Sequence, residues 1–187
     1  MLDARVKKVN STGGELPAFA FTNAGGIRAT INEGPVTRGE VLTSFPFGNE
    51  MVEIPLSGQQ IWDMFEGIVA RVNKNTTAKV TSFVQVSKGV EVLWHANNAT
   101  LNPSIGKLAA FKINRQPLQM DKVYKVVTID FLSNGGDNFL NPKVPGYQIE
   151  KLDEVLAKYI TQESPVNIKL EGRLRPVKSC RKRRHAL

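Results

Sequence analysis

Apolar and polar positions follow two different periods along this chain of 187 residues, and the period separates expected strands from expected helices. Several short segments are continuously apolar or alternate between apolar and polar residues, and turn residues bound them, which is typical of β-strands. The expected strands are residues 16–22, 51–56, 82–86, 90–94, 107–113, 123–129 and 167–170.

Helical spacing of apolar residues begins directly after the expected strand 51–56. Ser57 stands three residues before Gln60, and this pair is typical of a capping box at a helix N-terminus. The apolar residues that follow recur every three or four positions, which predicts a helix with one buried face. They are Ile61, Met64, Phe65, Ile68 and Val72. A second helix is predicted by the same spacing of Leu152, Val155, Leu156, Tyr159 and Ile160.

The turns between the expected strands indicate how the strands are grouped. Ser87, Lys88 and Gly89 separate strands 82–86 and 90–94, and a glycine in such a turn predicts a β-hairpin. A polar turn at 114–117 separates strands 107–113 and 123–129. Strands in hairpins with helices at two separate points predict the α+β class rather than a doubly wound βαβ sheet.

The composition fits one globular domain, because 41% hydrophobic and 22% charged residues are enough for a single core. No run approaches the roughly 18 apolar residues of a membrane span, so we expect no membrane partner. The single cysteine is Cys180, which excludes an internal disulfide. With only His95 and His185 besides, a metal centre rich in Cys or His is hard to build, and we expect no cofactor in this chain.

The positive charge is concentrated at the C-terminal end. Residues 175–187 hold six Lys or Arg and no acid, so the net charge of +8 falls to +2 when these six are set aside. Because this segment has no apolar period, we expect residues 1–174 to form the domain and residues 175–187 a disordered tail. A solvated tail is favoured over a nuclear signal or an RNA-binding arm, since short basic runs are weak motifs.

The first candidate site is the loop after strand 16–22. Gly25 and Gly26 can adopt positive φ and let backbone N–H groups approach a ligand. Arg28 offers a planar, permanently charged fork suited to phosphate, and the amide of Asn23 can both donate and accept hydrogen bonds. On these residues alone, a structural turn is as good an interpretation as an anion site.

Two further loops carry candidate ligand contacts. Phe47 stands between a proline and a glycine, which favours a turn that holds the ring outside regular structure, although such rings often pack back on the core. After strand 123–129, Phe131 precedes Asn134, Gly136 and Asp137. Here a glycine pair permits close backbone approach and the Asp137 carboxylate can accept bonds from vicinal hydroxyls, although an ordinary Asn-Gly turn would look the same.

Together the three loops supply what a nucleotide requires. Two aromatic faces can stack on a base, a carboxylate and amides can bind a ribose, and a cationic fork with glycine loops can bind phosphate. The combination is more specific than any single member.

The segments TNAGGIR at 22–28, FPFGNEMVEIPLSGQQI at 45–61 and FLSNGGDNF at 131–139 carry a family resemblance. In order and spacing, they resemble the C-terminal, substrate-binding domain of the 5'-nucleotidase family, which includes UDP-sugar hydrolases. The likeness covers about residues 18–174. It implies a four-layer α/β/β/α arrangement of mostly antiparallel sheets, consistent with the α+β class.

The resemblance also implies roles for individual residues. By position in the motifs, Asn23 would contact the nucleoside and Arg28 the phosphate. Phe47 and Phe131 would hold the base between their rings, and Asp137 would receive the ribose hydroxyls.

The chain also departs from the family pattern. Family members have a preceding metallophosphoesterase domain in which two divalent metals activate water, and no such motif occurs here. Met1 falls within the first helix of the family domain, so we expect a fragment of such an enzyme or a coding sequence that begins too late. A phosphate-contacting arginine upstream would then be missing.

The leading hypothesis is a nucleotide-binding domain that takes AMP-like ligands and is inactive without its metal-bearing partner domain. The resemblance places parent enzymes mostly outside the cell, on its membrane or in the periplasm. The alternative is a non-catalytic binding protein, for nucleotides or, through the basic tail, for nucleic acid. A third possibility is that the shortened domain does not fold stably.

Overall fold

The computed structural model describes residues 1–12, 14–72, 83–95 and 107–177. The α-helices are α1 (Leu2–Thr12), α2 (Arg38–Ser44), α3 (Gly58–Val72), α4 (Asp130–Ser133) and α5 (Leu152–Glu163). The strands are β1 (Phe19–Asn23), β2 (Glu50–Ser57), β3 (Val84–Val86), β4 (Val90–His95), β5 (Lys107–Ile113), β6 (Gln116–Pro117), β7 (Val123–Ile129), β8 (Tyr147–Lys151) and β9 (Leu174–Pro176). Two short 3-10 helices, η1 (Ala24–Gly26) and η2 (Gly136–Asn138), follow β1 and α4.

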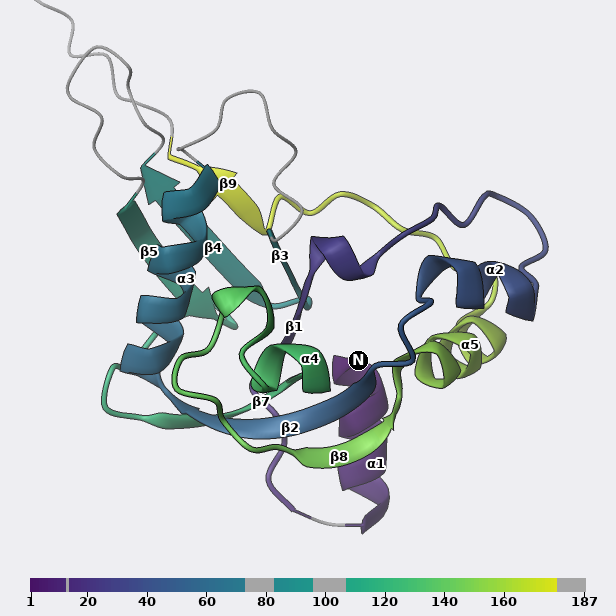
Figure 1. Cartoon of the computed structure of the whole chain (residues 1–187), viewed down its shortest axis with the longest axis horizontal. Coiled ribbons are helices and arrows are strands. Elements are labelled where there is room, and N and C mark those ends of the chain that lie inside the picture. Colours follow the sequence, from purple (N-terminus) through teal and green to yellow (C-terminus); the bar gives the residue numbers. More distant parts are fainter. Residues whose placement is uncertain (13, 73–82, 96–106, 178–187) are drawn as a thin grey trace, which may run out of the picture.

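Two sheets organise the chain (Figure 1). The first has five strands in the order β3-β1-β7-β2-β8, and the second has four in the order β6-β5-β4-β9. Neighbouring strands are antiparallel except in the pairs β1–β7 and β4–β9. The predicted α+β class, with mostly antiparallel sheets flanked by helices, is confirmed.

One apolar core joins both sheets to α3. Phe111 of β5 lies with its ring centroid 4.7 Å from that of Phe65 in α3 and 5.6 Å from that of Phe19 in β1. All three side chains are buried, and full burial of such a side chain stabilises the fold by about 1.5–3 kcal/mol. The predicted start of α3 is confirmed, because Ser57 and Gln60 exchange backbone and side-chain hydrogen bonds of 2.8 and 3.2 Å.

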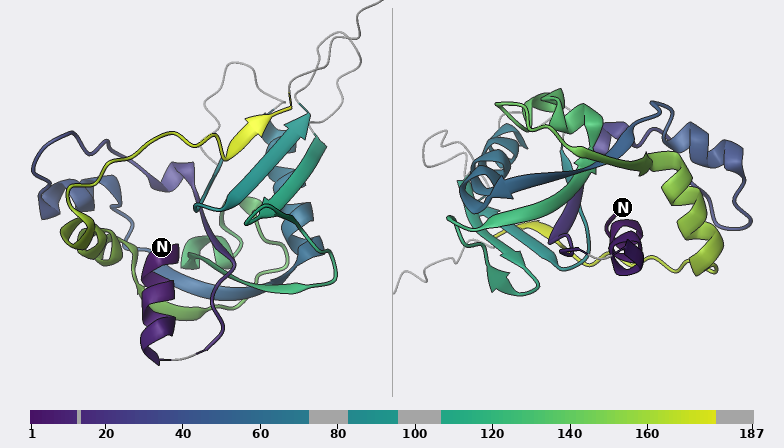
Figure 2. Two further views of the ribbon diagram at one scale, coloured as in Figure 1. Left: turned by 180° about the vertical axis from the view of Figure 1, so that it is seen from behind. Right: turned by 90° about the horizontal axis from the view of Figure 1, so that it is seen from below.

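Helix α1 lies next to the first sheet (Figure 2), and an ion pair ties it to β2. Nε of Arg5 donates to Glu53 of β2 at 2.7 Å and Nη2 donates to the second carboxylate oxygen at 3.2 Å. The hydrogen bond that Arg5 donates to the Glu53 carboxylate raises the pKa of Arg5 above its ordinary value. Both side chains are largely buried, so this two-pronged pair fixes the position of α1 on β2.

The predicted hairpin of strands 82–86 and 90–94 is wrong. Strand β3 pairs with β1 in the first sheet, whereas β4 pairs with β5 and β9 in the second. The turn at Gly89, with φ of +89°, therefore connects two sheets. The turn after β5 leads into the short strand β6, which forms a hairpin with β5. Strand β7, which follows, belongs to the first sheet.

The closing strand lies later than predicted. Residues 167–170 form no strand, and Ile168 and Leu170 are 84% and 103% exposed. Strand β9 instead follows Arg173 and pairs parallel with β4. It includes Arg175 and Pro176, so the first residues of the predicted tail are ordered, while residues 178–187 lie outside the described part.

Candidate functional site

The three sequence motifs meet at one edge of the first sheet, and the topology explains why. Strands β1 and β7 are parallel neighbours, so the loops that follow them lie at the same edge. Strand β2 is antiparallel to β7, with Met51 opposite Ile129, so the loop that precedes β2 reaches this edge too. These three loops are those of the three sequence motifs.

A cavity of about 430 Å³ lies between these loops. It is lined by Asn23, Gly25, Gly26, Arg28, Phe47, Asn49, Phe131 and Asp137. Seven of the nine residues proposed from the sequence therefore line one cavity.

The glycine loop is built differently from the prediction. Gly25 and Gly26 belong to η1, and neither has a positive φ, so that expectation is wrong. Gly26 is required for another reason. A Cβ at this position would lie 2.8 Å from Oδ1 of Asn23, closer than van der Waals contact permits.

Arg28 is held at the cavity by its backbone and by two neighbours. Its N–H donates to the carbonyl of Ser44 at 2.9 Å, and its Nη1 donates to the carbonyl of Gly25 at 3.3 Å. Its guanidinium carbon lies 5.7 Å from the centroid of the Phe47 ring. Within the described ranges Arg28 forms no ion pair with a carboxylate. Its positive charge therefore remains available to an anion in the cavity.

The two aromatic rings of the motifs are unusually exposed. Phe47 is 59% and Phe131 44% exposed, although large apolar side chains normally bury most of their surface. Gly48 has a φ of +64°, which provides the turn that was predicted to hold Phe47 outside regular structure. Neither ring packs back on the core, and both line the cavity.

One carboxylate that the sequence analysis missed fixes both aromatic loops. Oδ1 of Asp130 accepts a hydrogen bond from the N–H of Phe131 at 2.8 Å and another from the N–H of Glu50 at 3.1 Å. Phe131 belongs to α4 and lines the cavity, whereas Glu50 begins β2, three residues after Phe47. Asp130 immediately precedes the FLSNGGDNF motif, but the sequence does not reveal its long-range bond to Glu50.

Asp137 and Asn23 form a polar pair inside the cavity. Nδ2 of Asn23 donates to Oδ2 of Asp137 at 2.7 Å. Asn23 is only 5% exposed, and its Oδ1 is buried without a hydrogen-bond partner among the residues that the structure describes. Buried polar atoms are rarely left unpaired, so an unpaired oxygen beside a cavity is a candidate ligand contact.

Two proposed residues do not line the cavity, and one lining residue was missed. Asn134 ends α4 and is exposed. Gly136 lies behind the Phe131 ring, where an added Cβ would meet Cε1 at 2.5 Å. Asn49, which lines the cavity, directly follows the Pro-Phe-Gly turn and was part of the quoted motif.

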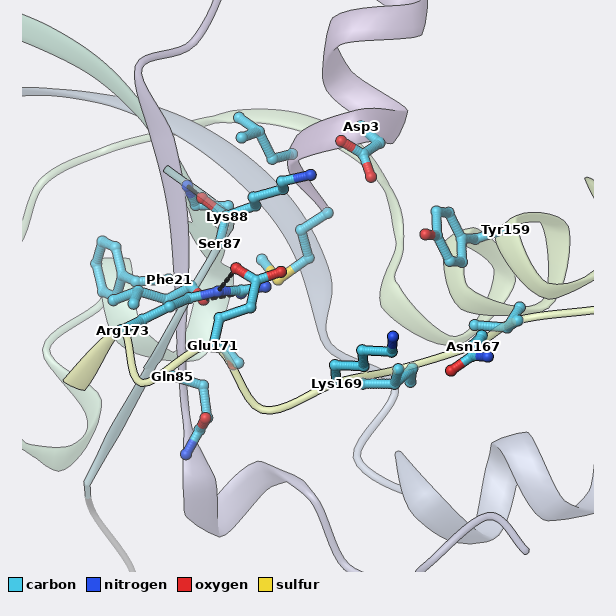
Figure 3. A pocket seen from close by; sticks show the side chains of 17 residues that line it. Asp3, Phe21, Gln85, Ser87, Lys88, Tyr159, Asn167, Lys169, Glu171 and Arg173 are labelled. Carbon is cyan, nitrogen blue, oxygen red and sulfur yellow. Dashed lines mark hydrogen bonds and ion pairs between the residues drawn. The ribbon is translucent and has the colours of Figure 1, made fainter. Parts of the chain in front are cut away.

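A second and larger cavity, of about 530 Å³, lies between α1, β3, α5 and the segment before β9 (Figure 3). Apart from Thr22, no residue of the three motifs lines it. Arg173 is engaged there by Glu171 at 2.9 Å and by the carbonyl of Val86 at 2.7 Å. Lys88 and Lys169 are exposed. The smaller cavity is thus the one that residues of all three motifs line.

The described part of the chain contains no group of three or more His, Cys, Asp or Glu residues placed to hold a metal ion. Among the helices in that part, none has the length and apolar character needed to cross a membrane.

Comparisons with known proteins agree with the motifs. A family model described as 5'-nucleotidase, C-terminal domain, matches residues 3–142. The apyrase of Tabanus yao is 31% identical over 165 residues, which cover 84% of this chain and 29% of the relative. The 5'-nucleotidase of Mus musculus is 30% identical over 168 residues, which cover 84% of this chain and 28% of the relative.

A solved structure gives the same result for the fold. The crystal structure of a 5'-nucleotidase precursor from Thermus thermophilus matches with a TM-score of 0.73 and 28% identity, covering 96% of this chain and 34% of that chain. This chain thus spans about a third or less of the length of each protein it matches here.

Proposed function

The chain belongs to the 5'-nucleotidase C-terminal domain family, and from this premise we propose that it binds a nucleoside monophosphate in the cavity of Phe47 and Phe131. One observation carries the proposal. Two half-exposed aromatic rings, an arginine without a carboxylate partner among the described residues and a carboxylate all line the same cavity.

The base stacks between the two rings in this proposal. A ring of the Phe type offers a π-face to any base, so stacking stabilises the complex without selecting one base strictly. The exposed surfaces of Phe47 and Phe131 provide the apolar area that a base would cover.

The sugar and phosphate contacts follow from charge and hydrogen bonding. The Asp137 carboxylate accepts bonds from the ribose hydroxyls, while Asn23 keeps it oriented. Arg28 binds the phosphate, because its planar fork provides paired donors for phosphate oxygens. Asn134 and Gly136 act indirectly, through the loop that carries Phe131 and Asp137.

Within the parent protein, we propose that this domain presents the nucleotide to a metallophosphoesterase domain supplied by the rest of the polypeptide. Two divalent metals would activate water for attack on phosphorus there. The described residues do not fit such a metal pair, since they contain no suitable cluster of ligands. We therefore assign binding and orientation, and no bond-breaking step, to this chain.

Comparing AMP with adenosine tests the proposal through Arg28. We expect the full chain to bind AMP about 10- to 150-fold more tightly than adenosine, because a hydrogen-bonded charged pair contributes roughly 1.5–3 kcal/mol. In an Arg28→Gln variant this preference disappears, while adenosine affinity changes little. Titration calorimetry measures both affinities.

Lys88→Gln is the matched control, because it removes one positive charge at the larger cavity instead. It should leave the preference for AMP unchanged. Equal affinity of the unaltered chain for AMP and adenosine, or loss of the preference in the Lys88 variant alone, would contradict the phosphate site at Arg28.

A further inference from the structure

The loop that carries Asp137 has an uncommon backbone conformation. Asp137 and Asn138 have φ values of +54° and +52°, and Gly135 has a φ of +90°. Consecutive non-glycine residues in the left-handed region are unfavourable, although Asp and Asn tolerate it better than most. Such a conformation persists when surrounding contacts impose it, and it is common at functional sites.

Arg71, in the last turn of α3, supplies those contacts. Its Nη1 donates to the carbonyl of Asp137, and its Nη2 donates to the carbonyl of Asn138 at 2.7 Å. The same guanidinium lies 5.9 Å from the centroid of the Phe139 ring, which is buried and stacks on Phe21 at 6.5 Å. One planar fork therefore binds the two carbonyls of the left-handed residues and rests on the core.

We propose that Arg71 is a positioning residue that holds the 135–138 loop so that the Asp137 carboxylate faces the ligand. Arg71 does not line the cavity and acts through the backbone alone. The role in ribose binding rests on the function proposed above, whereas the effect on the loop does not.

The geometry explains why two separate groups are needed. Asn23 binds the carboxylate of Asp137 from β1, and Arg71 binds the carbonyl of the same residue from α3. The first contact fixes the side-chain direction and the second fixes the backbone from which the side chain extends. Without the second contact, the loop could leave the left-handed conformation and turn the carboxylate away from the ribose.

The test compares AMP with 2',3'-dideoxyadenosine monophosphate, which lacks the hydroxyls that Asp137 would bind. An Arg71→Gln variant of the full chain should bind AMP about tenfold more weakly, the usual effect of losing a charged hydrogen bond at a binding site. Its affinity for the dideoxy analogue should stay within about twofold of the unaltered chain, because that ligand makes no use of the carboxylate.

A second substitution separates positioning from general stability. Asn138→Gly keeps the carbonyl and removes the penalty of positive φ, so it should restore part of the AMP affinity in the Arg71→Gln background. Asn114→Gly is the matched control, because Asn114 also has a positive φ, +49°, but lies in the β5–β6 turn. It should restore nothing.

Amide hydrogen exchange tests the loop itself without a ligand. The N–H groups of Asn138 and Phe139 bond to the carbonyls of Gly135 and Gly136 at 3.1 and 3.3 Å. In the Arg71→Gln variant they should exchange about tenfold faster, while the amides of β2 keep their rates.

Unchanged exchange in this loop, equal losses of affinity for both ligands, or rescue by Asn114→Gly as good as that by Asn138→Gly would each overturn the positioning role. If the unaltered chain binds neither ligand, the proposed function fails, and the exchange result still decides what Arg71 does to the loop.

Discussion

Replacing Phe131 by alanine is expected to weaken AMP binding by about 5- to 150-fold, because stacking of one base on an aromatic ring contributes roughly 1–3 kcal/mol. The loss should be similar for AMP and adenosine, since both contain the base. Protein stability should change little, because the ring is 44% exposed and contributes less to the core than a buried phenylalanine. Titration calorimetry and a thermal melt provide the two measurements.

Tyr147→Ala is a suitable control for that variant. Tyr147 is also an exposed aromatic residue, 63% exposed, but it lies over Arg5 and does not line the cavity. We expect its loss to leave AMP affinity unchanged. If Phe131→Ala and Tyr147→Ala have equal effects on AMP affinity, base stacking at Phe131 is excluded.

Replacing Gly58 by alanine is expected to destabilise the folded chain by about 3 kcal/mol, the upper range for forcing an added group into a packed site. A Cβ at Gly58 would lie 2.0 Å from the carbonyl oxygen of Gln119 and 2.9 Å from Cα of Met120. These are backbone atoms, so they cannot move aside by rotating a side chain. The N–H groups of Gly58 and Gln59 also donate to the carbonyls of Lys122 and Met120, at 2.9 and 3.0 Å.

Helix α3 contains a matched control for this substitution. Gly67 lies in the same helix, and a Cβ there would meet nothing within 4 Å. Gly67→Ala should therefore stabilise the chain by about 0.5–1 kcal/mol, since glycine is unfavourable inside a helix. Urea unfolding measures both changes. A Gly58→Ala variant as stable as the unaltered chain would show that the close packing of α3 on residues 119–120 is not as described.

The elements that the sequence predicted well are those determined by local chemistry. The Ser57–Gln60 capping box and the apolar stripe of α3 depend on neighbours within one or two turns. The capping box of Thr37 and Glu40 at α2 is equally local, but this helix of seven residues is too short to show an apolar period in the sequence. The family resemblance placed the Phe47 and Phe131 loops together, which composition alone does not do.

The features that the sequence could not predict depend on partners far along the chain. Alternation identifies the faces of β3 but not its neighbour, so its pairing with β1 instead of β4 was missed. The requirement for Gly26 comes from the side chain of Asn23, and the conformation of Asp137 from Arg71, 66 positions earlier. These contacts exist only once the two sheets and α3 have packed together.

Mapping where AMP binds tests the central claim most directly, because the two cavities described above are lined by different residues. In an isotope-labelled full chain, the account predicts that AMP shifts the backbone amide resonances of Gly25, Gly26, Phe47 and Phe131, while those of Lys88 and Lys169 stay in place. Shifts centred on Lys88 and Lys169, with none at the phenylalanine loops, would contradict it.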